Sequence, residues 1–184
     1  MNDFFINKDI YLRAIEPEDM DVLYKWENDT SLWHNGGGSL TPYSRFAIRQ
    51  YISNSLQDIY EIKQLRMMIA SKTTDEPVGT IDLYEFDAQN RRAGIGILVD
   101  KNYHRRGYAL QALECIEKYA FNHLHLYQIY ANIATHNQAS IFLFAKAGYT
   151  QTATLKSWLA VDNSYADVLV MQKFNNPQQI QPAK

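Results

Sequence analysis

The sequence predicts an α/β (α+β) protein in which helices pack on a sheet. Strand-like and helix-like segments follow one another in the order β-α-α-β-β-β-α-β-α-β-β. Three consecutive strand-like segments in the middle are separated only by short turns, which is typical of an antiparallel meander. An amphipathic segment over residues 107–121 then joins two apolar strand-like segments, which predicts one parallel β-α-β crossover. We expect this crossover to hold the function.

The composition fits one domain with a substantial hydrophobic core. Of the 184 residues, 46% are hydrophobic, 21% charged and 13% aromatic, which excludes a disordered, collagen-like or disulfide-stapled chain. The 18 basic and 20 acidic residues give a net charge of −2, so a nucleic-acid-binding protein is disfavoured. We expect residues 1–174 to form a single domain and the polar residues 175–184 to form a loose tail.

Three further features predict a cytoplasmic protein with no membrane partner. The single Cys115 cannot form an internal disulfide. The first five residues contain no basic segment and no long apolar run, so no secretory leader is expected. The longest apolar stretches, such as Gly94–Val99, are far shorter than the roughly 18 residues that cross a bilayer. No metal site is expected either.

The first elements are a strand and two helices. Residues Ile10–Ala14 alternate in polarity like a strand. Glu16 and Pro17 begin the first helix, because a proline at the first helical position needs no N–H partner and acidic residues favour the positive end of the helix dipole. Three consecutive glycines, Gly36–Gly38, require a loop. A second helix is expected to begin at Thr41–Pro42, and its apolar stripe is formed by Ile48, Tyr51, Ile52 and Leu56.

The meander consists of the strand-like residues 65–70, 78–86 and 92–99. Gly94 and Gly96 lie inside the third of these strands. Interior glycines weaken a strand, and they often mark a bulge or a position that a ligand approaches closely.

The second half of the chain begins with the helix over 107–121 and a buried strand over 129–134. Asn137 is expected to cap a helix over 139–147, and Gly148 ends that helix in the C′ position. The chain then closes in a hairpin whose strands are residues 150–160 and 164–173.

The turn before the helix over 107–121 has the features of an anion site. It contains the run His104-Arg105-Arg106-Gly107-Tyr108-Ala109. A helix start presents unpaired N–H groups and the positive end of the dipole, and two arginines add charge-assisted hydrogen bonds. The turn has neither a Gly-Lys-Ser/Thr ending nor the spacing Gly-x-Gly-x-x-Gly, so nucleotide hydrolysis and dinucleotide binding are disfavoured. A solvated basic turn is the alternative.

With this turn the sequence resembles the GNAT acetyl-CoA-dependent N-acetyltransferases. Their signature Gln/Arg-x-x-Gly-x-Gly/Ala is matched by His104–Ala109 at both small positions, whereas His104 departs from it. A second family block is similar to Asn137–Tyr149, about thirty residues further on. The resemblance extends over nearly the whole chain.

The resemblance implies a mixed, mostly antiparallel seven-stranded sheet. The sheet is expected to splay open between the strands that end at Val99 and Ala134, with a bulge at the in-strand glycines and acetyl-CoA in the gap as co-substrate. The coenzyme-binding residues that the resemblance implies are Ile97, Leu98, Val99, His104, Arg105, Arg106, Gly107, Tyr108, Ala109, Asn137 and Phe144.

Transfer of an acetyl group to an amine needs a base, because an amine with a pKa of about 10.4 is mostly protonated at neutral pH. Glu85 and His136 are the candidate catalytic residues; a solvated carboxylate and a surface or capping histidine are the alternatives. Much of the family has a tyrosine that protonates the leaving sulfur where this chain has Phe144. Three interpretations account for the difference. Another donor or a water protonates the sulfur, or the proton of the amine itself reaches the thiolate. In the third, the protein binds acetyl-CoA and barely turns over.

The acceptor is expected to be a primary amine, either a small molecule such as a polyamine or a peptide N-terminus. Residues Val78–Leu83 and Asn90–Ala93 resemble the branch of the family that contains spermidine and ribosomal-protein N-terminal acetyltransferases. The acidic residues that spermidine enzymes have after the position of Trp33 are absent, so spermidine is only one option. The carboxylates that remain as candidate partners of the acceptor are Glu27, Asp29, Asp82 and Glu85. The candidates for an aromatic wall of the acceptor groove are Trp26, Trp33, Tyr43 and Tyr84, with core or loop packing as the alternative.

Two other classes stay open: a non-catalytic acyl-CoA-binding module, and an unrelated α/β protein that binds another anion. Family members often dimerise, so a homo-oligomer is a further expectation from the resemblance.

Overall fold

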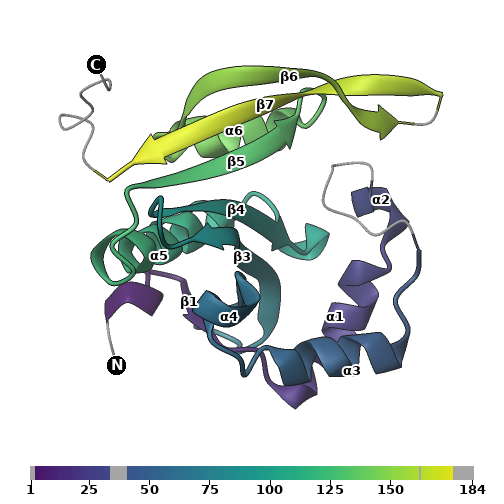
Figure 1. Ribbon diagram of the computed structural model, residues 1–184. Helices are drawn as coiled ribbons and strands as arrows, with labels where there is room; N and C mark the ends of the chain where they lie inside the picture. The colour runs from purple at the N-terminus through teal and green to yellow at the C-terminus, as the bar shows by residue number, and fades with distance from the viewer. Residues whose placement is uncertain (1–2, 34–40, 162, 176–184) are drawn as a thin grey trace.

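The computed structural model describes residues 3–33, 41–161 and 163–175. These residues form one sheet of seven strands in the order β1-β2-β3-β4-β5-β7-β6 (Figure 1). The strands are β1 Ile10–Arg13, β2 Leu65–Ser71, β3 Pro77–Asp87, β4 Arg92–Val99, β5 Gln128–Ala134, β6 Thr150–Val161 and β7 Ser164–Phe174. Only β4 and β5 pair in parallel; the other neighbours within the described residues are antiparallel. The predicted meander, crossover and closing hairpin are therefore confirmed.

The helices connect the strands in the predicted order, with short additions. The 3-10 turns are η1 Asp3–Phe5, η2 Pro17–Asp19 and η4 Lys101–Tyr103, and the α-helices are α1 Met20–Glu27, α2 Thr30–Leu32, α3 Arg45–Asn54, α4 Ile59–Ile62, α5 Tyr108–Asn122 and α6 Gln138–Lys146. None of the described helices combines the length and the apolar content that a bilayer-crossing helix requires.

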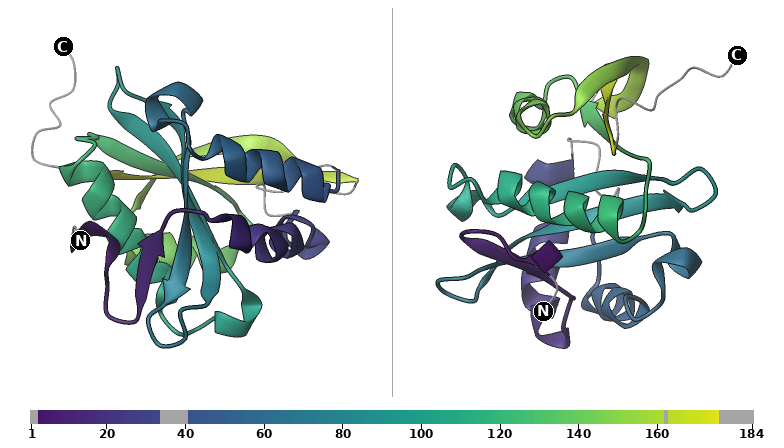
Figure 2. Two further views of the ribbon diagram at one scale, coloured as in Figure 1. Left: turned by 90° about the horizontal axis from the view of Figure 1, so that it is seen from below. Right: turned by 90° about the vertical axis from the view of Figure 1, so that its left-hand side faces the viewer.

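Helices cover both faces of the sheet, with α5 on one face and α1 and α3 on the other (Figure 2). Two apolar clusters lie between the helices and the sheet. On one face, Leu113 and Ile116 of α5 belong to a cluster with apolar residues of β1, β2, β3 and β4. On the other face, Met68 of β2 packs against Leu23 of α1 and Ile48 of α3. Successive strand residues point to opposite faces, so every second residue of β2, β3 and β4 lies on the α1–α3 side.

The local start and stop signals behave as predicted at three places. Pro17 is the first residue of η2, and Glu16 and Asp19 form a capping box. The Oδ1 atom of Asn137 accepts from Ser140 N at 3.1 Å and caps α6. Gly148 follows the end of α6 with a φ of +90°, a conformation that glycine adopts without strain.

The prediction for the second helix was wrong at both ends. Its N-cap is Ser44, whose hydroxyl accepts from Ala47 N, so the helix begins after Thr41–Pro42. The helix ends at Asn54, and Leu56 lies outside it with 89% of its surface exposed. Leu56 therefore does not extend the apolar stripe. The glycine loop at 36–38 lies outside the described residues.

Candidate active site

The sheet opens between its two parallel strands. β4 and β5 pair only at their first residues, where Arg92, Ala93 and Gly94 face Gln128, Ile129 and Tyr130. On its other edge β5 remains paired with β7 along its whole length. β4 and β5 thus diverge beyond Gly94 and Tyr130 within the described residues, as Figure 1 shows. This confirms the predicted splay.

The divergence leaves main-chain groups of β4 without a strand partner. The N–H of Asp100 donates to the carbonyl of Val78 on β3 at 2.8 Å. Because the bonding direction alternates along an antiparallel ladder, the N–H of Leu98 also faces β3, and those of Ile97 and Val99 face the gap. The carbonyl of Val99 accepts from His104 Nε2 at 2.8 Å. Of the three predicted strand residues, Ile97 and Val99 present their main-chain groups to the gap.

The turn after β4 places a helix start at the mouth of this gap. Gly107 is the N-cap of α5 with a φ of +79°, and no side chain caps this described helix end. The first intrahelical bond runs from Gln111 N to Gly107 O, so the N–H groups of the first turn, including Tyr108 and Ala109, have no helical partner. Gly107 has no side chain to cover them. The structure therefore places unpaired N–H donors together, which fits an anionic group.

Two exposed arginines flank these donors. Arg106 donates to the carbonyl of Asn102 at 3.2 Å, and its guanidinium lies 5.2 Å from the centre of the Tyr103 ring. Arg105 has a φ of +61°. Both side chains are exposed, so their charge adds to the positive end of the α5 dipole.

Asn137 and Phe144 belong to the helix after β5. Asn137 lies where β5 gives way to α6, and its side chain is used in the cap. Phe144 is only 3% exposed and packs edge-on against Tyr149, with 4.9 Å between ring centres. The position that carries a tyrosine in much of the resembled family is therefore an apolar core residue here.

The expected bulge at Gly94 and Gly96 is absent from the described strands. The register of β3 and β4 runs without a shift from Gly79 opposite Val99 to Tyr84 opposite Gly94. The shift lies instead between Tyr84 and Asp87. A β-carbon on Gly94 would lie 2.3 Å from the Tyr84 ring, whereas one on Gly96 would meet the same ring at 3.8 Å. Gly94 is therefore explained by a protein side chain, and the gap is opened by strand divergence.

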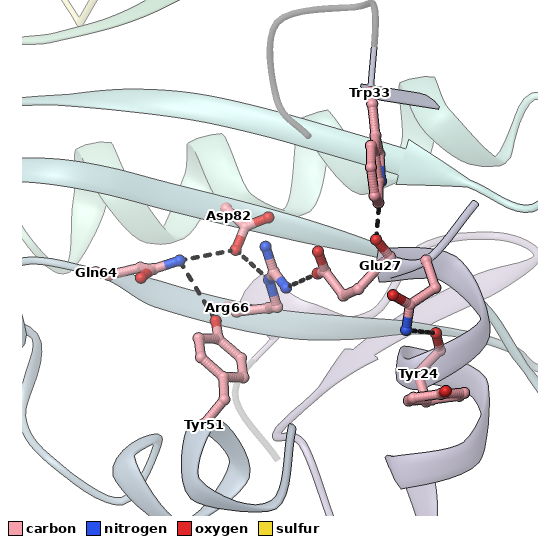
Figure 3. A network of polar contacts seen from close by, with 8 residues as sticks. Tyr24, Glu27, Trp33, Tyr51, Gln64, Arg66 and Asp82 are labelled. Atoms are coloured by element: carbon pink, nitrogen blue, oxygen red, sulfur yellow. Dashed lines mark hydrogen bonds and ion pairs between the residues drawn. The ribbon is translucent and has the colours of Figure 1, made fainter. Parts of the chain in front are cut away.

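A polar network lies on the α1–α3 side of the sheet, next to Gly96. Arg66, Asp82 and Gly96 are opposite one another on β2, β3 and β4. Arg66 Nε lies 2.5 Å from Asp82 Oδ1, and its Nη1 contacts Glu27 at the end of α1. Figure 3 shows the three side chains pointing toward one another. Gln64 Nε2 joins the network by donating to Asp82 Oδ1 at 3.4 Å.

Arg66 is the charged centre of this network. Its side chain is 18% exposed, and the guanidinium lies 5.0 Å from the centre of the Tyr51 ring. Burial alone would lower the pKa of Arg66, but the carboxylates of Asp82 and Glu27 reverse this and raise it. Burial raises the pKa of Tyr51 to about 12. Two carboxylates and one guanidinium leave this network with one net negative charge.

The two predicted catalytic residues lie at different ends of the gap. Glu85 is exposed, has a φ of +50°, and accepts from the hydroxyl of Tyr130, the last β5 residue that pairs with β4. His136 is exposed and lies two residues beyond the end of β5. Ala134 lies roughly 13 Å beyond Tyr130 along the strand. The structure does not bring Glu85 and His136 together at one point.

The aromatic residues proposed for the acceptor groove have separate environments. Trp26 is 5% exposed and donates to Asp100 Oδ2 at 2.9 Å, so it belongs to the core. Trp33 donates to the carbonyl of Glu27 at 3.0 Å and lies above the network in Figure 3. Sequence reasoning missed Arg66. Its signal was a charged residue inside the otherwise apolar run 65–70.

Comparisons with known proteins agree with this arrangement. Residues 9–150 match the family model described as "Acetyltransferase (GNAT) domain". The chain is 28% identical over 158 residues to an uncharacterized N-acetyltransferase p20 of Bacillus licheniformis, covering 85% of this chain and 88% of the relative. It is 24% identical over 173 residues to spermidine N(1)-acetyltransferase of Escherichia coli (strain K12), covering 91% and 87%.

A solved structure has the same fold. Spermidine N-acetyltransferase from Vibrio cholerae in complex with CoA and spermine superposes with a TM-score of 0.82 at 20% identity, covering 92% of this chain and 97% of that chain.

Proposed function

The chain belongs to the GNAT acetyltransferase family, and we propose that it transfers the acetyl group of acetyl-CoA directly to a primary amine. The observation that carries this proposal is the divergence of β4 and β5 beyond Gly94 and Tyr130, with the uncapped start of α5 at its mouth. An extended ligand is proposed to lie between the two strands, with its charged end at the helix start.

The residues present fit coenzyme A. Its diphosphate is proposed to bind the N–H groups of Tyr108 and Ala109 above Gly107, with Arg105 and Arg106 alongside, because unpaired amides and guanidinium groups are the usual protein donors to phosphate. The amide-bearing arm is proposed to pair with the main chain of Ile97 and Val99. The remaining proposed contacts are Leu98, His104, Asn137 and Phe144. When bound, acetyl-CoA supplies an activated acyl group on a sulfur that leaves readily.

The acceptor is proposed to carry little charge beyond its reacting amine. A polyamine needs a counter-charge for each additional ammonium group. Glu27 and Asp82 are both paired with Arg66, so together the three groups supply only one net negative charge. A monoamine or a peptide N-terminus therefore fits this face better than spermidine, although curated relatives carry that name.

The base that removes a proton from the amine is proposed to be either Glu85 or His136. Glu85 lies at the closed end of the gap beside Tyr130, and His136 lies at the end of β5 near Asn137. Glu85 is the better placed, because β4 and β5 separate immediately beyond Tyr130.

One observation favours a second candidate, a non-catalytic acyl-CoA-binding module. Phe144 is buried in the core and has no proton to donate to sulfur. General acid catalysis contributes about 10²–10⁴-fold to rates, so a protein without any proton donor would turn over slowly.

The test is release of free coenzyme A, detected with a thiol reagent, when acetyl-CoA meets a panel of monoamines, diamines, spermidine, aminoglycosides and peptides. Calorimetry with coenzyme A runs in parallel, and Gly107→Glu is the negative control. Release that depends on a monoamine or peptide supports the proposal. Binding without release by any amine selects the non-catalytic module, and no binding contradicts both. Light scattering of the same sample tests the expected self-association.

A further inference from the structure

Tyr84 spans the point at which the sheet opens. It lies on β3 opposite Gly94 of β4, and Gly94 in turn faces Tyr130 of β5 in the last pair of the two parallel strands. The Tyr84 ring lies so close to Gly94 that a β-carbon there would come within 2.3 Å of it. The ring also meets Tyr130 edge-on, with 6.2 Å between centres. Tyr84 therefore crosses over β4 and reaches β5.

The hydroxyl of Tyr84 lies beyond the Gly94–Tyr130 pair, where β4 and β5 separate. The main-chain N–H of Asn132, two residues past Tyr130, lies within reach of the hydroxyl and favours its ionised form. Burial and the nearby charge of Glu85 act more strongly in the other direction and raise the pKa of Tyr84 to about 12. The hydroxyl is thus neutral at physiological pH and carries a proton at the closed end of the gap.

The hydroxyl of Tyr130, which also lies near the closed end of the gap, already donates a hydrogen bond. Tyr130 donates its proton to Glu85 Oε2. Phe144 has no hydroxyl and faces Tyr149 in the core. Of Tyr84, Tyr130 and Phe144, Tyr84 is therefore the residue whose position and protonation suit proton donation into the gap.

We propose that Tyr84 is the residue that protonates the leaving sulfur during acetyl transfer. This inference rests on the proposed function. The amine nitrogen forms a bond to the carbonyl carbon, and the carbon–sulfur bond breaks with its electron pair going to sulfur. The Tyr84 hydroxyl proton passes to that sulfur, and the tyrosine oxygen regains a proton from the acylated nitrogen, directly or through water. The products are an amide and a thiol, and Tyr84 is unchanged.

The proton balance favours this coupling. Transfer from a tyrosine of pKa about 12 to a thiolate of pKa about 8.5 is unfavourable in isolation. The nitrogen becomes strongly acidic as the amide bond forms, so its proton restores the tyrosine. Proton donation from Tyr84 to sulfur and proton recovery from the nitrogen are then parts of one transfer. No acid besides Tyr84 is required.

The test compares Tyr84→Phe with Tyr119→Phe, which removes a hydroxyl from a half-buried tyrosine that packs on Phe5 away from the gap. Both variants are assayed with acetyl-CoA and with S-phenyl thioacetate, whose thiolate leaves without needing a proton. Tyr84→Phe is expected to lower kcat with acetyl-CoA about 100-fold. With S-phenyl thioacetate the same variant is expected to lose less than about 5-fold in kcat/KM. Tyr119→Phe is expected to change neither kinetic constant. Equal losses with both donors would assign Tyr84 a structural role and overturn the proposal.

A crystal structure with coenzyme A decides the question without turnover. The Tyr84 hydroxyl is expected within hydrogen-bond distance of the coenzyme sulfur. Coenzyme bound in the gap with its sulfur out of reach of Tyr84 removes this inference but leaves the proposed function intact. Failure to bind coenzyme at all removes both.

Discussion

Gly94 lies directly beneath the ring of Tyr84, and a β-carbon on Gly94 would approach that ring to 2.3 Å. The missing side chain on β4 is what allows a β3 tyrosine to extend across to β5. The closed end of the candidate active site therefore depends on this pair, although the two residues are ten positions apart in the sequence.

Gly94→Ala is expected to destabilise the protein by about 1–3 kcal/mol, because the new methyl group must displace the Tyr84 ring from a packed position. Gly96→Ala is the matched control. Its methyl group would meet Tyr84 at an ordinary 3.8 Å, and the loss of glycine's freedom in the unfolded chain offsets any small cost. Urea unfolding of both variants measures the difference. Equal unfolding free energies would show that the ring can move aside freely.

Gly107→Glu is expected to abolish measurable binding of coenzyme A. A carboxylate at the first residue before α5 would lie among the N–H groups that are proposed to bind the diphosphate, and like charges repel there. Gly107→Ala carries the same backbone strain at a φ of +79° without the charge. Calorimetry should show a much smaller loss for alanine than for glutamate. Undiminished affinity in the glutamate variant would contradict the site.

Arg66→Met is expected to cost about 3–5 kcal/mol of stability, because it leaves Glu27 and Asp82 as partly buried carboxylates without their cation. Adding Asp82→Asn should recover part of the loss. Arg92→Met provides the comparison, since Arg92 is half exposed in its pair with Asp87 and such pairs contribute about 0–1 kcal/mol. Chemical denaturation of the three variants separates these cases, and similar losses for Arg66 and Arg92 would argue against a buried network.

Asp100→Asn is expected to lower stability by about 2 kcal/mol at neutral pH. Burial would raise the pKa of Asp100, but hydrogen bonds from Asn102 N and Trp26 Nε1, together with Lys25, lower it to about 2. A carboxylate with a lowered folded pKa stabilises the protein above its unfolded pKa of about 3.9, and the stabilisation is lost as the pH falls toward 2. Unfolding midpoints of wild type and variant should converge between pH 4 and pH 2. A constant difference across that range would refute the assignment.

Phe144→Tyr is expected to change kcat by less than about 3-fold, because Tyr84 is proposed to donate the proton already. The new hydroxyl would enter the core beside Tyr149, and an unpaired buried hydroxyl costs about 1–3 kcal/mol. Steady-state rates and thermal unfolding measure the two effects. A large gain in turnover would instead mean that proton donation to sulfur limits the natural enzyme.

Much of the fold could be predicted because its signals are local. The capping asparagine at 137, the glycine at 148 and the proline at 17 each fix a helix end through groups within a few residues. The prediction for Leu56 is wrong because helical spacing places this apolar residue on the core stripe, whereas the helix ends two residues earlier. Spacing shows which face a residue would occupy and leaves open whether the helix continues that far.

The order of the elements and the basic turn at Gly107 could be predicted from the chain alone, since both depend on neighbouring residues. The separation of β4 and β5 is visible only in the folded protein, where β5 pairs with β7 along its whole length and with β4 at its first three residues. The partners of Arg66 are likewise visible only there, since they come from a helix and a strand distant in the chain. Contacts between such segments depend on packing and on cross-strand register, and a one-residue shift in register would turn Arg66 to the other face of the sheet.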